Sequence, residues 1–356
     1  MIRIEIDPVW RFRREDNGQS MLVMLEFLKE IRASGKITRA ASHAQISYRH
    51  SWNLIEKWAT FFGAPLVERE QGRGTRLTPL GEKLVWAGQR LQARLRPQLQ
   101  NLAQELETEI NDTLPQRTKI LRVHASHGFA VSVLRDLIGR DPRIGVDLRY
   151  VTNQNSLVSL AHAGCELAGV HLPQGALRKK VISAVRPWLN ATEHRAIGFV
   201  TREMGLMVKR DNPLRITSLE KLLQPGVRFV NRDPDSGTRL LFDQLLQQQR
   251  LDGTRLDGYE RVEFTHAAVA AYVASGMADV CFGVEAAARQ FELDFVRLAT
   301  EDYFFVCRKQ ILENEAVQKV LAIMRGEEFH DAIEKLPGYA TRDPGRVKGI
   351  QEALRG

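Results

Sequence analysis

Hydrophobic and polar positions alternate at the start of the chain. Over residues 2–6 isoleucines alternate with charged residues, which is the period of a β-strand with one exposed face. Pro8 limits this strand, and a second short strand is predicted near Trp10–Arg13. An Asp-Asn-Gly turn signal follows at residues 16–18. We therefore expect residues 1–19 to form an N-terminal β extension, which would add a strand to the domain that follows.

The period of the apolar positions then changes to that of helices. The pattern predicts a first helix from Met21 to Ser34, a short helix from Thr38 to Ala44, and a third from Ser47 to about Phe62. Two short β-like pieces come next, joined by a polar loop that contains glycine, at Leu66-Val67 and Arg76-Leu77. Three helices and a small hairpin predict a winged helix-turn-helix over residues 20–80.

A long helix is predicted after this hairpin, over residues 78–111. Thr78 is a favourable N-cap, and Pro79 suits the first helical turn because that turn leaves its N–H groups unpaired. Leucines recur at helical spacing to about Ile110. An apolar stripe of this length favours pairing with a second copy of the chain, as a dimer or a tetramer. Packing of the stripe on its own domain remains the alternative.

The second half of the chain alternates strands with helices. A polar linker at residues 111–117 precedes it. Strands are predicted at Ile120–Ala125, Val146–Val151, Leu167–His171, Ala196–Thr201, Leu206–Lys209, Val227–Asn231, Val280–Phe282 and Tyr303–Cys307. Such alternation implies parallel sheets covered by helices. The predicted fold class is α+β multidomain: a winged helix-turn-helix and a linker helix, followed by two Rossmann-like α/β lobes in residues 118–356.

Charge and cysteine content narrow the class of protein. The net charge is +8, and residues 1–100 hold 17 Lys/Arg against 10 Asp/Glu. A basic N-terminal third favours a polyanion partner, while a merely soluble basic surface remains possible. Cys165, Cys281 and Cys307 are too far apart for a disulfide framework or a zinc site, so we expect buried thiols. Without a secretion signal or a membrane-spanning run, we expect a cytoplasmic protein.

The segment 37–53 has the features of a DNA-reading pair of helices. Small residues at Ala40, Ala41 and Ala44 let two helices cross closely, and Ser47 caps the second of them. The start of that helix would meet base edges and phosphates, and the loop after it would follow the phosphate backbone. A helical hairpin with a solvated basic face is the alternative. The candidate DNA-binding residues are Thr38, Arg39, Ser47, Tyr48, Arg49, His50, Asn53, Lys57, Arg69, Arg73 and Arg76.

These residues resemble a known family of regulators. The run ITRAASHAQISYRHSWNLIE, followed by LVERE and TRLTPLGEKLV, is similar to the N-terminal domain of molybdate-responsive, ModE-type regulators over residues 20–110. LysR-type regulators are similar over the same region, including the long dimerising helix. The extension at residues 1–19 departs from the usual LysR-type start.

Several strand-to-helix turns of the second half are candidate anion sites. The turn at 233–239 would direct backbone N–H groups outward at a helix start, together with serine and threonine hydroxyls. An ordinary capped helix is the alternative there. The turn at 124–129 is similar, and His171, Arg202 and His266 end or begin neighbouring elements. The candidate ligand-binding residues are Ser126, His127, Gly128, His171, Arg202, Asp235, Ser236, Gly237, Thr238, Arg239, Thr265 and His266.

The second half also resembles a known domain. VNRDPDSGTRLLFDQLL and GYERVEFTHAAVAAYVASGMADVCFGV are similar to the periplasmic-binding-protein-like (type 2) domain of molybdate-related regulators. The resemblance implies crossover strands near Ile197–Thr201 and Tyr303–Cys307. Lobe I would then comprise about residues 118–196 and 305–356, and lobe II about 200–303. It also implies an anion held between the lobes.

The combined prediction is a DNA-binding transcriptional regulator that senses a small anion. Molybdate, tungstate and a small carboxylate such as formate are the candidate effectors, and the regulated genes would serve a molybdenum-dependent enzyme or oxyanion metabolism. A regulator that senses a pterin-type molybdenum cofactor, or a constitutive DNA-binding protein, remains the alternative. An enzyme is not expected, because no nucleophilic triad, nucleotide loop or metal-spaced cluster is found. No cofactor is expected.

Overall fold

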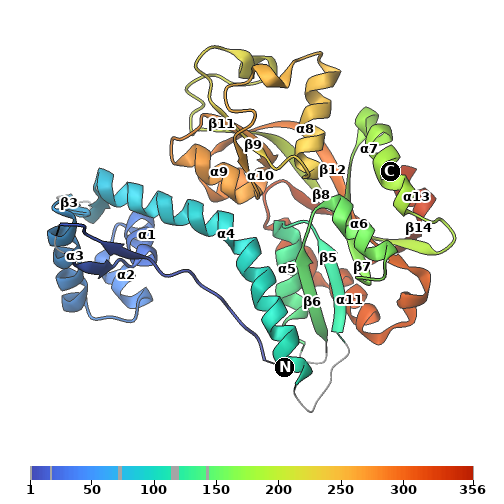
Figure 1. The fold of residues 1–356 in the computed structure, drawn as a ribbon, viewed down its shortest axis with the longest axis horizontal. Helices are drawn as coiled ribbons and strands as arrows, with labels where there is room; N and C mark the ends of the chain where they lie inside the picture. The colour runs from blue at the N-terminus through green and yellow to red at the C-terminus, as the bar shows by residue number, and fades with distance from the viewer. Residues whose placement is uncertain (1, 17, 71–73, 114–119, 142–143, 356) are drawn as a thin grey trace. The chain divides into compact units, whose positions relative to one another are not determined.

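The structure is a computed structural model that describes residues 2–16, 18–70, 74–113, 120–141 and 144–355. The chain folds into two compact units, Asp7–Ala93 and Met1–Ile6 with Arg94–Gly356. Figure 1 shows the course of the chain.

The first unit is a winged helix-turn-helix, as predicted. Its helices are α1 (Leu25–Ser34), α2 (Ile37–His43) and α3 (Tyr48–Phe62). Its wing strands, antiparallel to each other, are β3 (Val67–Glu70) and β4 (Gly74–Leu77). The fully buried Trp58 and the nearly buried Phe27 meet edge to face in the core, with ring centroids 5.8 Å apart. Glycines in the left-handed region end two helices, Gly35 after α1 and Gly63 after α3.

The N-terminal extension differs from its prediction in one respect. The strand expected over residues 2–6 is absent, because Ile2 and Ile4 donate their backbone N–H groups to side chains of helix α4 instead of to a neighbouring strand. The second strand is present as β1 (Arg11–Arg13), and it pairs with β2 (Ser20–Leu22). This hairpin takes up Met21, so α1 begins four residues later than the apolar pattern indicated.

Helix α4 (Pro79–Asp112) is the predicted long helix. Thr78 caps it by accepting a hydrogen bond from the N–H of Gly81 at 3.2 Å. Early in the helix Leu84 and Val85 are buried in the core of the first unit. Later apolar positions, Leu102 and Leu106 among them, are exposed. The stripe therefore packs on its own domain at one end and leaves an apolar face at the other.

In the part of the chain that the structure describes, the second unit is built on one sheet of ten strands. The strand order is β10-β9-β11-β8-β12-β7-β5-β6, and β13 and β14 pair with β8. The strands are β5 (Ile120–Ala125), β6 (Gly145–Tyr150), β7 (Leu167–Pro173), β8 (His194–Val208), β9 (Phe229–Arg232), β10 (Val262–Glu263), β11 (Val280–Val284), β12 (Asp294–Arg308), β13 (Tyr339–Thr341) and β14 (Val347–Gly349).

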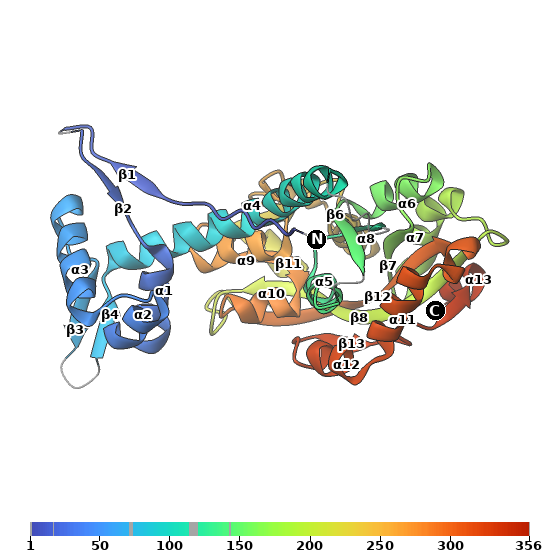
Figure 2. The same ribbon diagram turned by 90° about the horizontal axis from the view of Figure 1, so that it is seen from below.

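Helices cover this sheet. They are α5 (Phe129–Ile138), α6 (Asn153–Ala161), α7 (Arg178–Val185), α8 (Gly237–Gln248), α9 (His266–Ala274), α10 (Glu285–Gln290), α11 (Glu315–Arg325), α12 (Glu327–Glu334) and α13 (Ile350–Arg355). Helices α11 and α12 pack beside α5, as Figure 2 shows. The three cysteines are buried and free, as expected, and burial raises the pKa of Cys165 to about 11.

Two long strands join the two lobes of this unit. In the first lobe β5 pairs in parallel with β6 and β7, and in the second β9 pairs in parallel with β10 and β11. Between them β8 and β12 run antiparallel to each other and continue from one lobe into the other (Figure 1). The predicted strands Ala196–Thr201 and Leu206–Lys209 are thus parts of one strand, β8. The two lobes share one sheet instead of having one sheet each.

Candidate functional site

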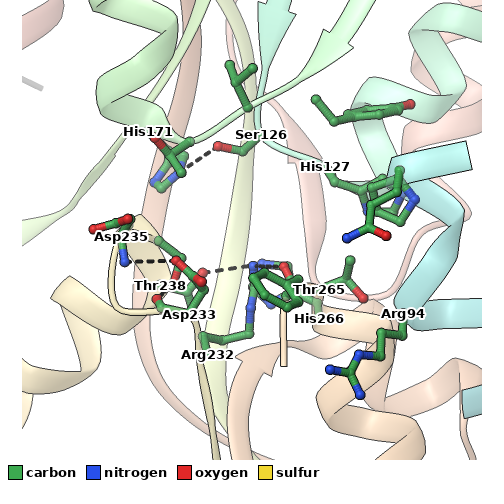
Figure 3. A pocket seen from close by; sticks show the side chains of 18 of the residues that line it. Arg94, Ser126, His127, His171, Arg232, Asp233, Asp235, Thr238, Thr265 and His266 are labelled. Atoms are coloured by element: carbon green, nitrogen blue, oxygen red, sulfur yellow. Dashed lines mark hydrogen bonds between the residues drawn. The ribbon is translucent and has the colours of Figure 1, made fainter. Parts of the chain in front are cut away.

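A cavity of about 350 Å³ lies between the lobes, at the carboxyl ends of β5, β6, β7 and β9 (Figure 3). Ligands of open α/β sheets bind at this end of the strands. The residues that line it are Arg94, Pro97, Gln98, Asn101, Ser126, His127, Tyr150, Val151, Thr152, His171, Arg202, Arg232, Asp233, Asp235, Ser236, Gly237, Thr238, Phe264, Thr265 and His266.

The start of helix α8 forms one side of the cavity. Ser236 caps the helix, since its Oγ accepts a hydrogen bond from the N–H of Arg239 at 3.1 Å. Gly237 lies against the ring of His171 from the opposite lobe: a Cβ at Gly237 would stand 2.1 Å from His171 Cε1. Only glycine fits here without a shift of the His171 ring or of the lobes. The first turn of α8 therefore approaches both the cavity and the facing lobe.

The start of helix α9 contributes in the same way. Thr265 caps it by accepting a hydrogen bond from the N–H of Ala268 at 2.9 Å. His266 is buried, and its Nε2 lies 3.4 Å from Thr238 Oγ1. Its Nδ1 has no hydrogen-bond partner in the described residues. Burial, and then the nearby Arg232 and Arg202, lower the pKa of His266 well below its usual value, so the ring is neutral at physiological pH.

Two further histidines come from the first lobe. Ser126 Oγ lies 3.4 Å from His171 Nε2, and both residues line the cavity. The ring of His127 meets that of Tyr150 at 4.7 Å between centroids, and its Nε2 is buried without a partner among the described residues. Burial, with Arg96 and Arg232 nearby, lowers the pKa of His127 to about 3. A neutral imidazole has one donor and one acceptor nitrogen, so the unpartnered Nε2 of His127 can meet a polar ligand.

The charge of Arg202 is already compensated inside the protein. Arg202 and Glu301 are both about 1% exposed, and Arg202 Nη2 lies 2.7 Å from Glu301 Oε2. Burial alone would raise the pKa of Glu301, but Arg202 and then His171 hold it at about 2. His171 Nδ1 also lies 3.4 Å from Glu301 Oε1. Arg202 thus lines the cavity as one half of an ion pair.

Arg232, the last residue of β9, is a buried cation that, unlike Arg202, has no carboxylate partner among the described residues. Its Nη2 donates to the carbonyl of Phe264 at 2.8 Å, while its Nε and Nη1 have no hydrogen-bond partner among the described residues. Arg232 takes part in none of the ion pairs that the described residues form. Burial, and then the charge of Arg202, lower the pKa of Arg232 to about 9. A buried, unpaired guanidinium is costly in free energy, and an anion in the cavity would relieve that cost.

Ten of the twelve predicted ligand-binding residues line this cavity; Gly128 and Arg239 do not. The guanidinium of Arg239 points away, pairing with Asp243 at 3.0 Å and stacking on the ring of Tyr259. Gly128 is the N-cap residue of α5. Sequence reasoning missed Arg232, although it lies in the quoted VNR motif, directly before the turn that was singled out. It also missed Tyr150, Asp233 and Phe264, and the four residues of α4.

The candidate DNA-binding residues lie exposed on the first unit. Ser47 caps α3 as predicted, its Oγ accepting a hydrogen bond from the N–H of His50 at 3.1 Å. The guanidinium of Arg69 lies over the ring of Trp52, 4.5 Å from its centroid, so the wing is held against α3. Arg73 falls outside the described residues. The exposed candidates are Thr38, Arg39, Ser47, Tyr48, Arg49, His50, Asn53, Lys57, Arg69 and Arg76.

Both units match models of known protein families. The model for the "PBP superfamily domain" matches residues 134–325, more than half of the chain. The chain belongs to the PBP superfamily. The model for the "Bacterial regulatory helix-turn-helix protein, lysR family" matches residues 22–82. The protein is therefore a LysR-type, DNA-binding transcriptional regulator with a PBP-like ligand-binding domain, and it is not an enzyme.

Individual relatives of this LysR-type regulator match parts of it. The uncharacterised protein YvgK of Bacillus subtilis is 29% identical over 56% of this chain, and the match spans 64% of YvgK. The transcriptional regulator ModE of Haemophilus influenzae is 37% identical over 17% of this chain and 26% of ModE. The structure of Corynebacterium glutamicum OxyR has 15% identity and a TM-score of 0.46, covering 87% of this chain and 92% of OxyR.

No helix among the described residues has the length and apolar composition needed to cross a membrane. Nor does any group of three or more His, Cys, Asp or Glu side chains there lie close enough together to hold a metal ion.

Proposed function

We propose that the cavity of the PBP-like domain binds a small anion and that this binding controls the attachment of the regulator to promoter DNA. Candidate effectors are molybdate, tungstate and a small carboxylate such as formate. The regulated genes would serve a molybdenum-dependent enzyme or oxyanion metabolism. The protein would act in the cytoplasm, where the DNA is, as a dimer or tetramer paired through the exposed stripe of α4.

The observation that carries the proposal is the unpaired guanidinium of Arg232. Two of its nitrogen atoms, Nε and Nη1, are buried without a partner among the described residues. The starts of α8 and α9 face the same cavity, and helix N-termini favour negative charge. The carboxylates of Asp233 and Asp235 also line the cavity and oppose an anion. Asp233 Oδ1 is engaged locally, since it accepts a hydrogen bond from the N–H of Asp235 at 2.9 Å.

The volume of the cavity supports a second candidate effector. About 350 Å³ is within the range of small-molecule pockets and corresponds to roughly ten water molecules. A single oxyanion or formate would share this space with water. A larger ligand with an anionic group, such as a pterin-type molybdenum cofactor, would use more of it.

The decisive experiment is thermal unfolding of the full chain with molybdate, tungstate, sulfate, phosphate or formate. An effector at about 100 times its Kd should stabilise the protein by about 2.7 kcal/mol. Arg232→Met should abolish this shift, and Arg255→Met, at an exposed position outside the cavity, should retain it. A shift with molybdate and tungstate alone would indicate an oxyanion sensor, and a shift with formate alone a carboxylate sensor. No shift with any of the five would overturn the small-anion proposal.

A further inference from the structure

The linker helix α4 borders the cavity, and so do the two lobes. Arg94, Pro97, Gln98 and Asn101 all line it. Their spacing of three, four and seven residues places them on one face of a helix. All four belong to the same compact unit as the lobes. One face of the helix that continues from the DNA-binding unit is therefore a wall of the candidate effector site.

Polar contacts connect this face of the helix to both lobes. The Asn101 side chain bonds twice with the backbone of Tyr150, at the end of β6: its Oδ1 accepts from the N–H at 2.9 Å and its Nδ2 donates to the carbonyl at 3.1 Å. Two turns earlier, Arg94 Nε lies 3.6 Å from the buried Oε2 of Glu263 in β10. Since β6 belongs to the first lobe and β10 to the second, α4 bridges the two lobes beside the cavity.

Several buried polar atoms beside the cavity have no hydrogen-bond partner among the described residues. His127 Nε2, from the first lobe, is buried and has no partner among the described residues. In the second lobe the same holds for Arg232 Nε and Nη1 and for His266 Nδ1. Figure 3 shows Arg94 and His127 toward the same side of the pocket. Buried polar groups are nearly always paired in folded proteins, so these atoms indicate a polar ligand that is enclosed from several directions.

We infer that α4 supplies a third wall of the effector site and that the bound anion contacts Arg94 and Gln98, directly or through one ordered water. This inference rests on the function proposed above. Occupancy of the site is then sensed by the same continuous helix that begins at the wing, and not only by a change between the lobes. An effector acts on an equilibrium only through a difference in affinity for its two states. In one of these states residues 94–104 of α4 are docked on the lobes, and in the other they are not.

Hydrogen exchange of the full chain tests the docking of α4 without any ligand. Asn101→Ala removes both bonds to Tyr150 and should speed amide exchange over residues 98–105. The control is Glu109→Gln, at an exposed position further along the same helix. It should leave exchange over 98–105 unchanged. Equal exchange in wild type and Asn101→Ala would overturn the inference.

The second arm uses molybdate, tungstate and formate, each added separately to saturation. Slower exchange at 126–129, 236–239 and 95–104 together is the expected result. Arg94→Gln and Gln98→Ala should each weaken affinity for the active probe by roughly tenfold, with Glu109→Gln unaffected. Slower exchange at the first two segments alone, with unchanged affinity in both variants, would overturn the third wall and leave the anion site standing. No response to any probe in any segment would overturn the proposed function, and this inference with it.

Discussion

Polar residues serve the two candidate sites of this protein in different ways. On the first unit they are exposed, and most come from one helix, α3, and the wing beside it. In the cavity of the second unit several of them are buried, among them His171, Arg232 and His266, and the lining comes from segments far apart in the chain. An exposed polar residue has water as an alternative partner, whereas a buried one must find its partner within the protein or in a ligand. A buried polar group without a partner in the cavity therefore indicates a ligand. An exposed polar group without a protein partner indicates nothing, because water can pair with it.

The same contrast exists inside the cavity between two arginines. Arg202 has a carboxylate partner, Glu301, and Arg232 has none among the described residues. Because Arg202 is paired, we interpret it as a structural residue. Because Arg232 has no such partner among the described residues, it is a candidate ligand contact. The predictions below test this contrast and then the one between the two units.

The largest effect is expected for Glu301→Gln, which leaves Arg202 buried without its partner. Breaking a buried ion pair from one side destabilises a protein by about 3–5 kcal/mol. The pKa of Glu301 is held at about 2, below its ordinary value, so its contribution is present above the ordinary pKa and is lost as pH falls through 2. Urea unfolding at neutral pH measures the loss. The comparison variant is Arg232→Met, which should not destabilise the ligand-free protein. Equal losses in the two variants would contradict the distinction.

A second large effect is expected for Gly237→Ala. The added Cβ would stand 2.1 Å from His171 Cε1, so either the ring of His171 or the lobes must shift at this point. Affinity for the active anion should fall by roughly tenfold or more, since the ligand's partners lie on both lobes. Isothermal titration of the full chain measures this. Gly349→Ala, where nothing lies within 4 Å of the added Cβ, is the control. Unchanged affinity in Gly237→Ala would show that the cavity does not need this close approach.

On the exposed site, Arg49→Ala should weaken DNA binding by about 1–3 kcal/mol and relax the sequence preference at one position. Arg76→Ala should weaken binding to all sequences alike and reduce the salt dependence by about one phosphate contact. Fluorescence anisotropy at several KCl concentrations separates the two, using a duplex selected from a random library by the full chain. A loss that is uniform across sequences in Arg49→Ala would place that residue on the backbone instead of on a base.

How far the sequence predicted the molecule also differs between the two sites. The winged helix-turn-helix and the caps Ser47 and Thr78 depend on neighbours within a few residues, so local patterns predicted them. Arg232 appeared to be an ordinary strand residue, because only the folded sheet shows that it has no counter-ion. The wall formed by α4 could not be predicted either, since it depends on where residues 94–101 dock.

The pH dependence of anion binding tests the charge on Arg232. Its pKa is lowered to about 9, so the guanidinium is charged at neutral pH and loses its proton above about pH 9 in the empty cavity. An anion stabilises the charged form and so raises that pKa in the complex. Affinity should therefore be flat from pH 7 to about 8.5 and then fall by up to about tenfold per pH unit. Titrations up to pH 10.5 measure this. A flat profile would mean that Arg232 is not the charge that the anion neutralises.

The smallest effect is expected at Ser47, where capping and DNA contact coincide in one residue. Ser47→Ala removes the acceptor for the N–H of His50 and should destabilise the first turn of α3 by about 1 kcal/mol. Hydrogen exchange of the first amides of α3 in the full chain measures this, and Ser42→Ala, at an exposed position in α2, is the control.

Ser47→Asp separates the two roles of this residue. Aspartate caps a helix as well as serine does, so exchange should match that of wild type. Its charge would repel phosphate, so DNA binding should still weaken, and more so at low salt. If Ser47→Asp binds DNA as wild type does, Ser47 is a cap and lies away from the phosphates. If it binds less well with the helix intact, the start of α3 faces the DNA backbone, as the exposure of its polar residues predicts.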